Sequence, residues 1–307
     1  MSMLLLHPAP RRGAFSRLKR NGSAAVSLIL LACLLLACFG APLIGVALGI
    51  DATSIDLFNI SAPPSAAHPL GTDEIGRDLL MRLLDGGRVS LTVGIAAAVS
   101  ATVIGTLIGL SAGYRGGIAD AVLMRIADGV ISLPLLPLLI VLAAIDPAKT
   151  GLPPELVQSE GFSLYRIVAI IAVVGWTTTA RLVRGTVLSL RERDFIEAAR
   201  AQGLPPSRIL FRHLLPNAAS PILVAMTLTI GNVILFESVL SFLGLGIQPP
   251  IPSWGNMLTG AQDLIAVSPM LAIWPGLLIF AAVIAFNFLG DGLQDALDPR
   301  AQNRHGR

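Results

Sequence analysis

Six long apolar segments constrain this chain more than any other feature of its sequence. A helix needs about 20 mostly apolar residues to cross the hydrocarbon core of a membrane. Only 13% of the 307 residues are charged, against about 25% in a typical soluble domain, so the chain lacks the polar surface of a soluble fold. We predict an all-α polytopic membrane protein with six transmembrane helices, at about 23–50, 88–113, 119–145, 165–186, 219–246 and 267–290.

The basic residues predict which side of the membrane each loop occupies. Arginine and lysine collect on the cytoplasmic side of membrane proteins. They cluster here in the N-terminal tail 1–22, in the connection after the fourth span and in the C-terminal tail 291–307. Six spans put these segments on one side, so both termini are expected in the cytoplasm and residues 51–87 on the opposite face. This asymmetry explains the net charge of +3, and we expect no nucleic-acid partner.

Two loops on the outer side have sequences that predict ordered structure rather than a flexible linker. Thr72, followed by Asp73 and Glu74, is typical of the cap of a short amphipathic helix, which would rest on the outer membrane face or on a partner. The alternative is a solvated linker. The proline-rich segment 247–258 predicts a rigid surface, and its Trp254 is expected at the membrane–water boundary.

The second span carries a small residue at every fourth position. Ala97, Ala101, Gly105, Gly109 and Gly113 share one helix face. Small residues form a groove that lets another helix backbone approach closely. We therefore predict tight helix packing along this face, and the pattern says nothing of a substrate.

Polar side chains inside the spans are costly and form a second set of candidates. Arg125 and Asp128 are one turn apart in the third span, which predicts a structural ion pair, with a role in the pathway as the alternative. Asn232 and Glu237 have no evident partner within the fifth span. Glu237 belongs either to the substrate pathway or to a helix-to-helix hydrogen bond, and the sequence favours neither.

No catalytic or metal-binding pattern is recognisable in the sequence. The four histidines are scattered over tails and loops, and no two have the spacing of metal ligands. Neither a G-x-S-x-G sequence nor a phosphate-binding Walker A loop occurs. We expect no catalytic residue, no metal and no cofactor on this chain. If ATP drives the protein, a partner must bind it.

The segment DFIEAARAQGLPPSRILFRHLLPN, residues 194–217, interrupts the apolar pattern with charge and prolines. A first helix is predicted over Arg191–Gln202, ending at Gly203. Pro205 and Pro206 suit the first turn of a second helix, and Pro216 is expected to stop it. The prediction is a cytoplasmic helix-turn-helix.

The side chains of the first helix suggest that this element docks on a partner. Ala198 and Ala199 lack bulk, so another surface can approach closely, while Glu197 and the arginines offer polar contacts. The alternative is a basic linker lying on anionic lipid. The glycine and paired prolines favour docking, because they set a bend that lipid binding does not need.

This segment resembles the EAA loop of ABC importer permeases. Glu197, Ala198, Ala199, Gly203 and Leu215–Pro216 carry the pattern, and His213 stands where the general pattern has isoleucine, as is usual in the peptide branch. Three further blocks resemble the C-type permease subunit of dipeptide and oligopeptide importers, so the similarity runs from about residue 25 to 300. They are HPLGTDEIGRD at 68–78, SFLGLGIQPPIPSWGNML at 241–258 and FNFLGDGLQDALDPR at 286–300.

The resemblance implies a type I ABC permease domain at 88–290 with a coupling loop at 191–217. It also implies a second permease subunit, two nucleotide-binding subunits that hold ATP and Mg, and an extracytoplasmic substrate-binding protein, in the lipids of a bacterial inner membrane. The expected cargo is dipeptides or oligopeptides, with nickel or glutathione as alternatives. A secondary transporter with Glu237 as its proton site is the alternative from another class. The residues expected to couple to the ATPase are Glu197, Ala198, Ala199, Arg200, Gly203, Leu215 and Pro216.

Overall fold

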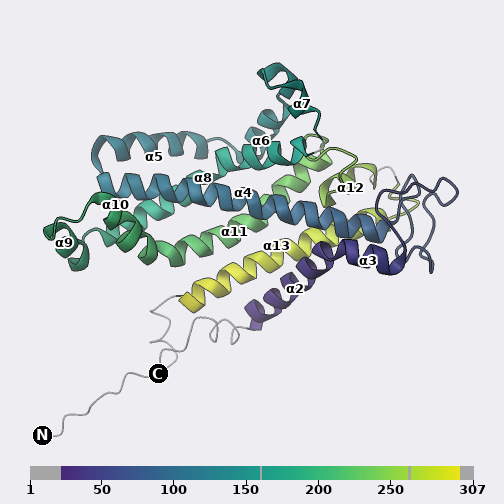
Figure 1. The fold of residues 1–307 in the computed structure, drawn as a ribbon, viewed down its shortest axis with the longest axis horizontal. Coiled ribbons are helices and arrows are strands. Elements are labelled where there is room, and N and C mark those ends of the chain that lie inside the picture. The colour runs from purple at the N-terminus through teal and green to yellow at the C-terminus, as the bar shows by residue number, and fades with distance from the viewer. Residues whose placement is uncertain (1–21, 160, 262–263, 298–307) are drawn as a thin grey trace, which may run out of the picture.

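The computed structural model describes residues 22–159, 161–261 and 264–297, which form a bundle of long helices lying side by side (Figure 1). The predicted tails lie outside this part, apart from Gly22 and residues 291–297. In the described residues the elements are α2 (Gly22–Phe39), α3 (Ala41–Leu48), α4 (Leu79–Arg115), α5 (Gly117–Ile131), α6 (Leu135–Ala144), the 3₁₀ turn η1 (Pro147–Thr150), α7 (Pro154–Val157), α8 (Phe162–Leu190), α9 (Asp194–Ala201), α10 (Pro206–Arg208), the π-helical segment η2 (Ile209–Leu214), α11 (Leu215–Phe242), α12 (Trp254–Ala261) and α13 (Met270–Leu297).

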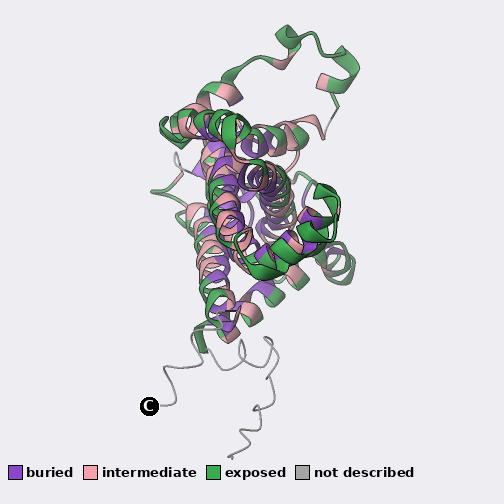
Figure 2. Ribbon diagram, turned by 90° about the vertical axis from the view of Figure 1, so that its left-hand side faces the viewer, coloured by how far each residue is buried: buried purple, intermediate pink, exposed green. Residues whose placement is uncertain are grey.

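The all-α, polytopic fold class is confirmed. Within the described ranges, five stretches are long and apolar enough to cross a membrane: α2, α4, α8, the continuous helix from α10 to α11, and α13. The pair α5 and α6 makes a sixth span if it crosses as one unit. Figure 2 shows buried residues concentrated where the long helices face one another, with exposed residues on their outward faces.

The third span is not the single helix predicted over 119–145. The axes of α5 and α6 differ by 87°, and the break falls between Ile131 and Leu135. Pro134 accounts for the break, because proline has no N–H to continue the helix and disfavours helical geometry in the residue before it. The first span is interrupted too, at Gly40, where α2 ends and α3 begins with Pro42 in its first turn.

Helix α4 begins earlier than expected, and the prediction of a separate helix capped by Thr72 is wrong. Asp78 is the cap, and its Oδ1 accepts a hydrogen bond from the Met81 N–H at 2.8 Å. No proline follows, so the helix runs unbroken to Arg115. The Thr72 hydroxyl instead accepts from the Ala62 N–H at 2.8 Å and donates to the carbonyl of Asn59, which fixes the preceding loop.

The glycines of α4 lie against α8. A Cβ atom added at Gly105 would be 2.5 Å from the carbonyl oxygen of Trp176, and one at Gly109 would be 2.5 Å from that of Ala180. At Gly113 the obstacle is the Val187 side chain, at 2.8 Å. These distances are below van der Waals contact, so the two backbones approach as closely as they do because α4 has no side chain at these positions.

Trp254 is part of the core. Its side chain is fully buried, and its Nε1–H donates to the Leu83 carbonyl of α4 at 2.9 Å. A long tryptophan ring fits there because Gly87 leaves room: a Cβ at that position would lie 2.6 Å from the ring.

The bundle has two different ends (Figure 1). Helices α9 and α10 lie at one, which we refer to as the α9 end. Helices α3 and α12 lie at the other, together with the loop that precedes α4; we refer to it as the α12 end.

Candidate functional site: the α9 end and the buried polar groups

Helix α9 is a short helix held between two turns at the α9 end. It begins at Asp194, shortly after α8 ends at Leu190. It ends at Ala201, and Gly203, two residues later, has a φ of +74°, in the left-handed region that favours glycine. The N–H groups of Gly203 and Leu204 donate to the carbonyls of Arg200 and Ala199, at 2.9 and 3.2 Å. The glycine therefore ends the helix with its last carbonyls satisfied.

Helix α9 has one buried side and one exposed side. Ile196 and Ala199 are buried in a small core that also holds Ile209 and Leu214. Glu197, Ala198 and Arg200 are exposed. The expectation that Ala199 faces a partner is wrong, because its side chain packs on the chain's own core. We refer to Glu197, Ala198 and Arg200 as the α9 surface.

Two arginines fix this segment to the end of α4. The Arg200 guanidinium lies over the Tyr114 ring, 5.2 Å from its centre, in cation–π geometry. Arg191 Nη1 donates to the Gly113 carbonyl at 3.1 Å. A force applied to α9 is therefore passed to α4 as well as to α8.

The second half of the loop runs directly into the fifth span. Pro216 was expected to stop the helix, and this prediction is wrong: Pro216 lies in the first turn of α11, and the helical stretch from Pro206 to Phe242 is continuous. Pro216 comes just after the π-helical η2, where the Leu215 N–H bonds to the Leu210 carbonyl and the regular α-helical hydrogen-bond pattern is already interrupted. The carbonyl of His213, near the end of η2, accepts a hydrogen bond from Asn217 Nδ2 at 2.6 Å.

Glu237 is fully buried and hydrogen-bonded at the α12 end of the bundle. Its Oε2 accepts from the Ser90 hydroxyl of α4 at 2.9 Å, and its Oε1 from the Ser241 hydroxyl of α11 at 2.7 Å. These hydroxyls accept in turn from the backbone N–H groups of Trp254 and Ile247, at 3.2 and 3.0 Å. One carboxylate thus joins α4, α11 and the segment before α12. This geometry corresponds to the helix-to-helix alternative rather than to a pathway group.

The structure does not bring Asn232 and Glu237 together. Asn232 is exposed on the outward face of α11, whereas Glu237 points into the bundle. Five residues separate them, which is about 140° around an α-helix. The two residues predicted as one pathway pair therefore belong to different environments.

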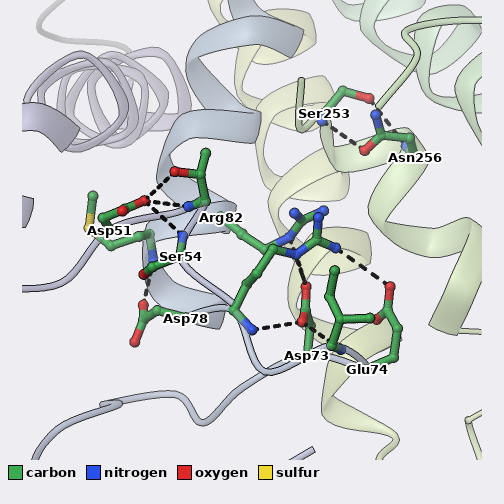
Figure 3. A network of polar contacts seen from close by, with 12 residues as sticks. Asp51, Ser54, Asp73, Glu74, Asp78, Arg82, Ser253 and Asn256 are labelled. Carbon is green, nitrogen blue, oxygen red and sulfur yellow. Dashed lines mark hydrogen bonds and ion pairs between the residues drawn. The ribbon is translucent and has the colours of Figure 1, made fainter. Parts of the chain in front are cut away.

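A polar network in the loop before α4 was missed from the sequence (Figure 3). Asp73 Oδ2 pairs with Arg77 Nε at 2.7 Å and with the buried Arg82 of α4 at 3.2 Å. Its Oδ1 accepts from the N–H groups of Ile75 and Arg77, at 3.0 and 2.9 Å. The block HPLGTDEIGRD contains most of these residues, but sequence spacing alone does not show that they close onto Arg82.

The same network holds the start of α4. The helix cap Asp78 also pairs with His68, whose Nδ1 lies 3.0 Å from Asp78 Oδ2. At the neighbouring α12, Ser253 and Asn256 hydrogen-bond each other reciprocally through backbone N–H and side-chain oxygen, at 2.9 and 3.2 Å (Figure 3). The loops of the α12 end are therefore built as rigid surfaces.

Asp128 pairs with α8, and the predicted ion pair with Arg125 is wrong. Asp128 Oδ1 lies 2.8 Å from Arg181 Nη2. A second pair joins the same helices: Asp120 accepts from Arg184 Nε and Nη2, at 2.5 and 2.6 Å. Both acids of α5 lie on the side of the helix that faces α8. Their ion-pair partners are therefore arginines of α8 and not Arg125.

The described residues contain no group of three or more histidine, cysteine or acidic side chains that could hold a metal ion. The features that stand out are instead the exposed α9 surface and the close helix packing along α4 and α8.

Comparison with known proteins assigns the family. Residues 105–303 match the family described as binding-protein-dependent transport system inner membrane component. The chain belongs to this family. Residues 10–64 match the N-terminal TM domain of oligopeptide transport permease C. Together with its long apolar helices, this makes the chain a multi-pass transport subunit of the inner membrane.

Three relatives show how far the similarity extends. A dipeptide transport system permease protein of Alkalihalophilus pseudofirmus is 40% identical over 96% of this chain and 91% of its own length. An oligopeptide transport system permease protein of Escherichia coli is 44% identical over 76% of this chain and 73% of its own length. A glutathione transport system permease protein of Pectobacterium atrosepticum is 41% identical over 78% of this chain and 75% of its own length.

Proposed function

We propose that this chain is the transmembrane permease subunit of an ATP-driven importer of dipeptides or oligopeptides, which a substrate-binding protein delivers. The observation that carries the proposal is the α9 surface. Its exposed Glu197, Ala198 and Arg200 stand on a helix whose other side is packed on the bundle. The permease relatives named for dipeptide and oligopeptide transport support the cargo class.

In this proposal the α9 surface docks in a cleft of a nucleotide-binding subunit, which binds ATP and Mg and hydrolyses the ATP. Two such subunits serve the permease and a second, similar permease subunit. Docking at this place suits energy transfer, because α9 is tied to α4 through Tyr114 and is followed directly by the fifth span. Movement of the docked helix then tilts α4, α8 and α11 as packed units.

The proposed orientation puts the α9 end and both termini in the cytoplasm. Arg193, Arg200, Arg208 and Arg212 are exposed at the α9 end, in agreement with the preference of basic residues for that side. The α12 end then faces the binding protein, and its loops are braced by the Asp73 network.

Two alternatives differ in their support. Glutathione as cargo is supported by the 41% identical glutathione permease, but the relatives named for dipeptide and oligopeptide transport give the peptide proposal more support. A proton-driven secondary transporter would need Glu237 as a proton site. Its carboxylate is fully buried and bonded to two serine hydroxyls, which gives a proton no evident route.

The test is transport by the complex in liposomes, with ATP inside and binding protein and labelled peptide outside. Glu197→Ala should abolish uptake and the coupling of ATP hydrolysis to substrate, because it removes a charged contact from the α9 surface. Glu192→Ala is the matched control, since Glu192 is an exposed acid before α9 begins. Uptake by the purified chain alone, under a pH gradient and without ATPase subunits, would overturn the proposal.

A further inference from the structure

An ion pair lies half-exposed on the outward face of α5 and α8. The exposed fraction is 51% for the Arg181 side chain and 45% for that of Asp128, whose charged groups are 2.8 Å apart. Arg181 is about 14 Å along α8 from its last residue, Leu190, at 1.5 Å per residue. Asp128 is about 17 Å along α5 from Gly117. Both charges thus lie within the predicted spans 119–145 and 165–186 and yet are open to the outside of the chain.

Several exposed residues around this pair are polar or small, although Ile131, one turn after Asp128, and Leu182, next to Arg181, are also exposed. Arg125 lies one turn before Asp128 on α5 and is exposed. Thr178 and Gly185 lie on the side of α8 that carries Arg181 and are exposed as well. We refer to Arg125, Asp128 and Arg181 as the charged strip. By contrast, Ile126 is 53% exposed and lies roughly 160° around α5 from Asp128, on a side suited to lipid.

The charged strip does not suit lipid or a dry interface. Charged side chains at membrane depth face the bundle interior or a water-filled cavity. Here one aspartate stands against two arginines, so the strip keeps a net positive charge. A purely apolar partner surface would leave that charge buried and unpaired, which is strongly unfavourable.

Arg181 retains hydrogen-bonding capacity. A guanidinium has five N–H donors in a planar fork, which suits a carboxylate. Its contact with Asp128 uses Nη2, and the buried Asp128 Oδ1 accepts no well-aligned hydrogen bond from the described residues despite the short distance. The pairing is therefore an ion pair that a second carboxylate can join or replace.

We propose that the charged strip lines the water-filled pathway of the assembled transporter, and that Arg181 binds the C-terminal carboxylate of a passing peptide. Asp128 holds the guanidinium in place when no peptide is present. The carboxylate contact of Arg181 rests on the proposed function as a peptide permease. The exposure of the charged strip to water does not, since it follows from the charge and position of the strip.

The first experiment tests whether the strip meets water. In the complete transporter with Cys33→Ser, Thr178→Cys is compared with Ile126→Cys, using a membrane-impermeant maleimide. Cys38 is buried and can stay. We expect Thr178→Cys to be labelled and Ile126→Cys to be protected, although Thr178 lies deeper, about 18 Å against 14 Å from the helix ends at the α9 end. Protection of Thr178→Cys, or equal labelling of both, would overturn the proposal.

The second experiment tests the carboxylate contact. Uptake of a peptide with a free C-terminus is compared with uptake of its C-terminal amide, in the wild type, Arg181→Gln and Arg181→Lys. Loss of a charge-assisted hydrogen bond predicts that Arg181→Gln lowers uptake of the free acid roughly tenfold more than that of the amide, and that lysine restores part of it. If Arg181 had only a structural role, its replacement would lower the uptake of both peptides by the same factor.

The outcomes separate the two proposals. If the wild type imports peptides and the ratio of free-acid uptake to amide uptake does not change in Arg181→Gln, the carboxylate contact is refuted and the proposed function stands. If the wild type imports neither peptide, the proposed function fails and the carboxylate contact fails with it. The labelling experiment still decides whether the strip faces water.

Discussion

Gly109→Ala should separate α4 from α8. The added Cβ would lie 2.5 Å from the Ala180 carbonyl oxygen, 2.8 Å from Val183 Cβ and 3.0 Å from the Arg184 nitrogen. Ordinary contact begins at 3.4 Å, so the helices must move apart by close to 1 Å. Two of the three obstacles are backbone atoms, which no side-chain rotation can remove.

The cost follows from this displacement. Overpacking of this kind costs about 1–3 kcal/mol, and a gap of 1 Å also weakens the contacts at neighbouring positions of the same rigid helix. Replacing glycine by alanine in a helix returns up to about 1 kcal/mol through propensity, which partly hides the loss. A control that gains the same propensity without the clash is therefore needed.

Gly276→Ala in α13 supplies that control, because nothing lies within 4 Å of the added Cβ. The assay is the melting temperature of both variants in detergent, followed by fluorescence-detected size-exclusion chromatography. A difference of about 2 kcal/mol predicts a Tm for Gly109→Ala that is roughly 3 °C below that of Gly276→Ala. Equal melting temperatures would show that α4 and α8 are not in contact at Gly109, and would refute the reasoning.

Three further predictions concern the α12 end. Glu237→Ala should lower stability and the yield of assembled complex, while the complexes that do assemble still transport, because it leaves the Ser90 and Ser241 hydroxyls without their acceptor. Normal assembly with lost uptake would instead mark Glu237 as a pathway group. Asp78→Ala should cost about 0.5–2 kcal/mol through loss of the α4 cap, measurable as a lowered Tm, whereas Asp78→Asn keeps a capping oxygen and should cost less. The Thr53 backbone N–H holds the pKa of Asp51 below its usual range, so its stabilisation of the loop is present above about pH 4 and is lost as the pH falls further. Limited proteolysis of this loop should therefore accelerate at pH 3 but remain unchanged between pH 5 and 8.

The features that depend on neighbouring residues could be predicted from the sequence. Apolar length predicted most of the long helices, but not the break between α5 and α6. The small residues at 97–113 indicated a close helix contact, although not its partner. Gly203 was expected to end α9, and its φ of +74° shows why glycine is needed there. The family resemblance also rested on short contiguous blocks, which is why it was visible without a structure.

The wrong predictions have one thing in common: a short stretch of sequence does not show what surrounds a residue in the fold. Asp128 was paired with Arg125 one turn away, but its side chain reaches Arg181 on another helix. Pro216 was expected to stop a helix, but the π-helical η2 just before it already interrupts the α-helical hydrogen-bond pattern, and the helical stretch continues through Pro216. Ala198 and Ala199 are the same residue type in neighbouring positions, so the sequence does not distinguish them. The side on which α9 packs against the bundle makes Ala199 buried and Ala198 exposed.

The sequence by itself determined that this chain is an all-helical membrane protein and that residues 194–217 resemble the EAA loop of ABC importer permeases. Both properties are local, because they depend on apolar length and on a contiguous motif. Only the tertiary structure decided what the polar residues inside the spans do. Ser90 and Glu237 are 147 residues apart in the chain and 2.9 Å apart in the fold, and Arg181 meets Asp128 across two helices. Helix spacing gives the face on which such a side chain lies, but the packing of the whole bundle determines what that face meets.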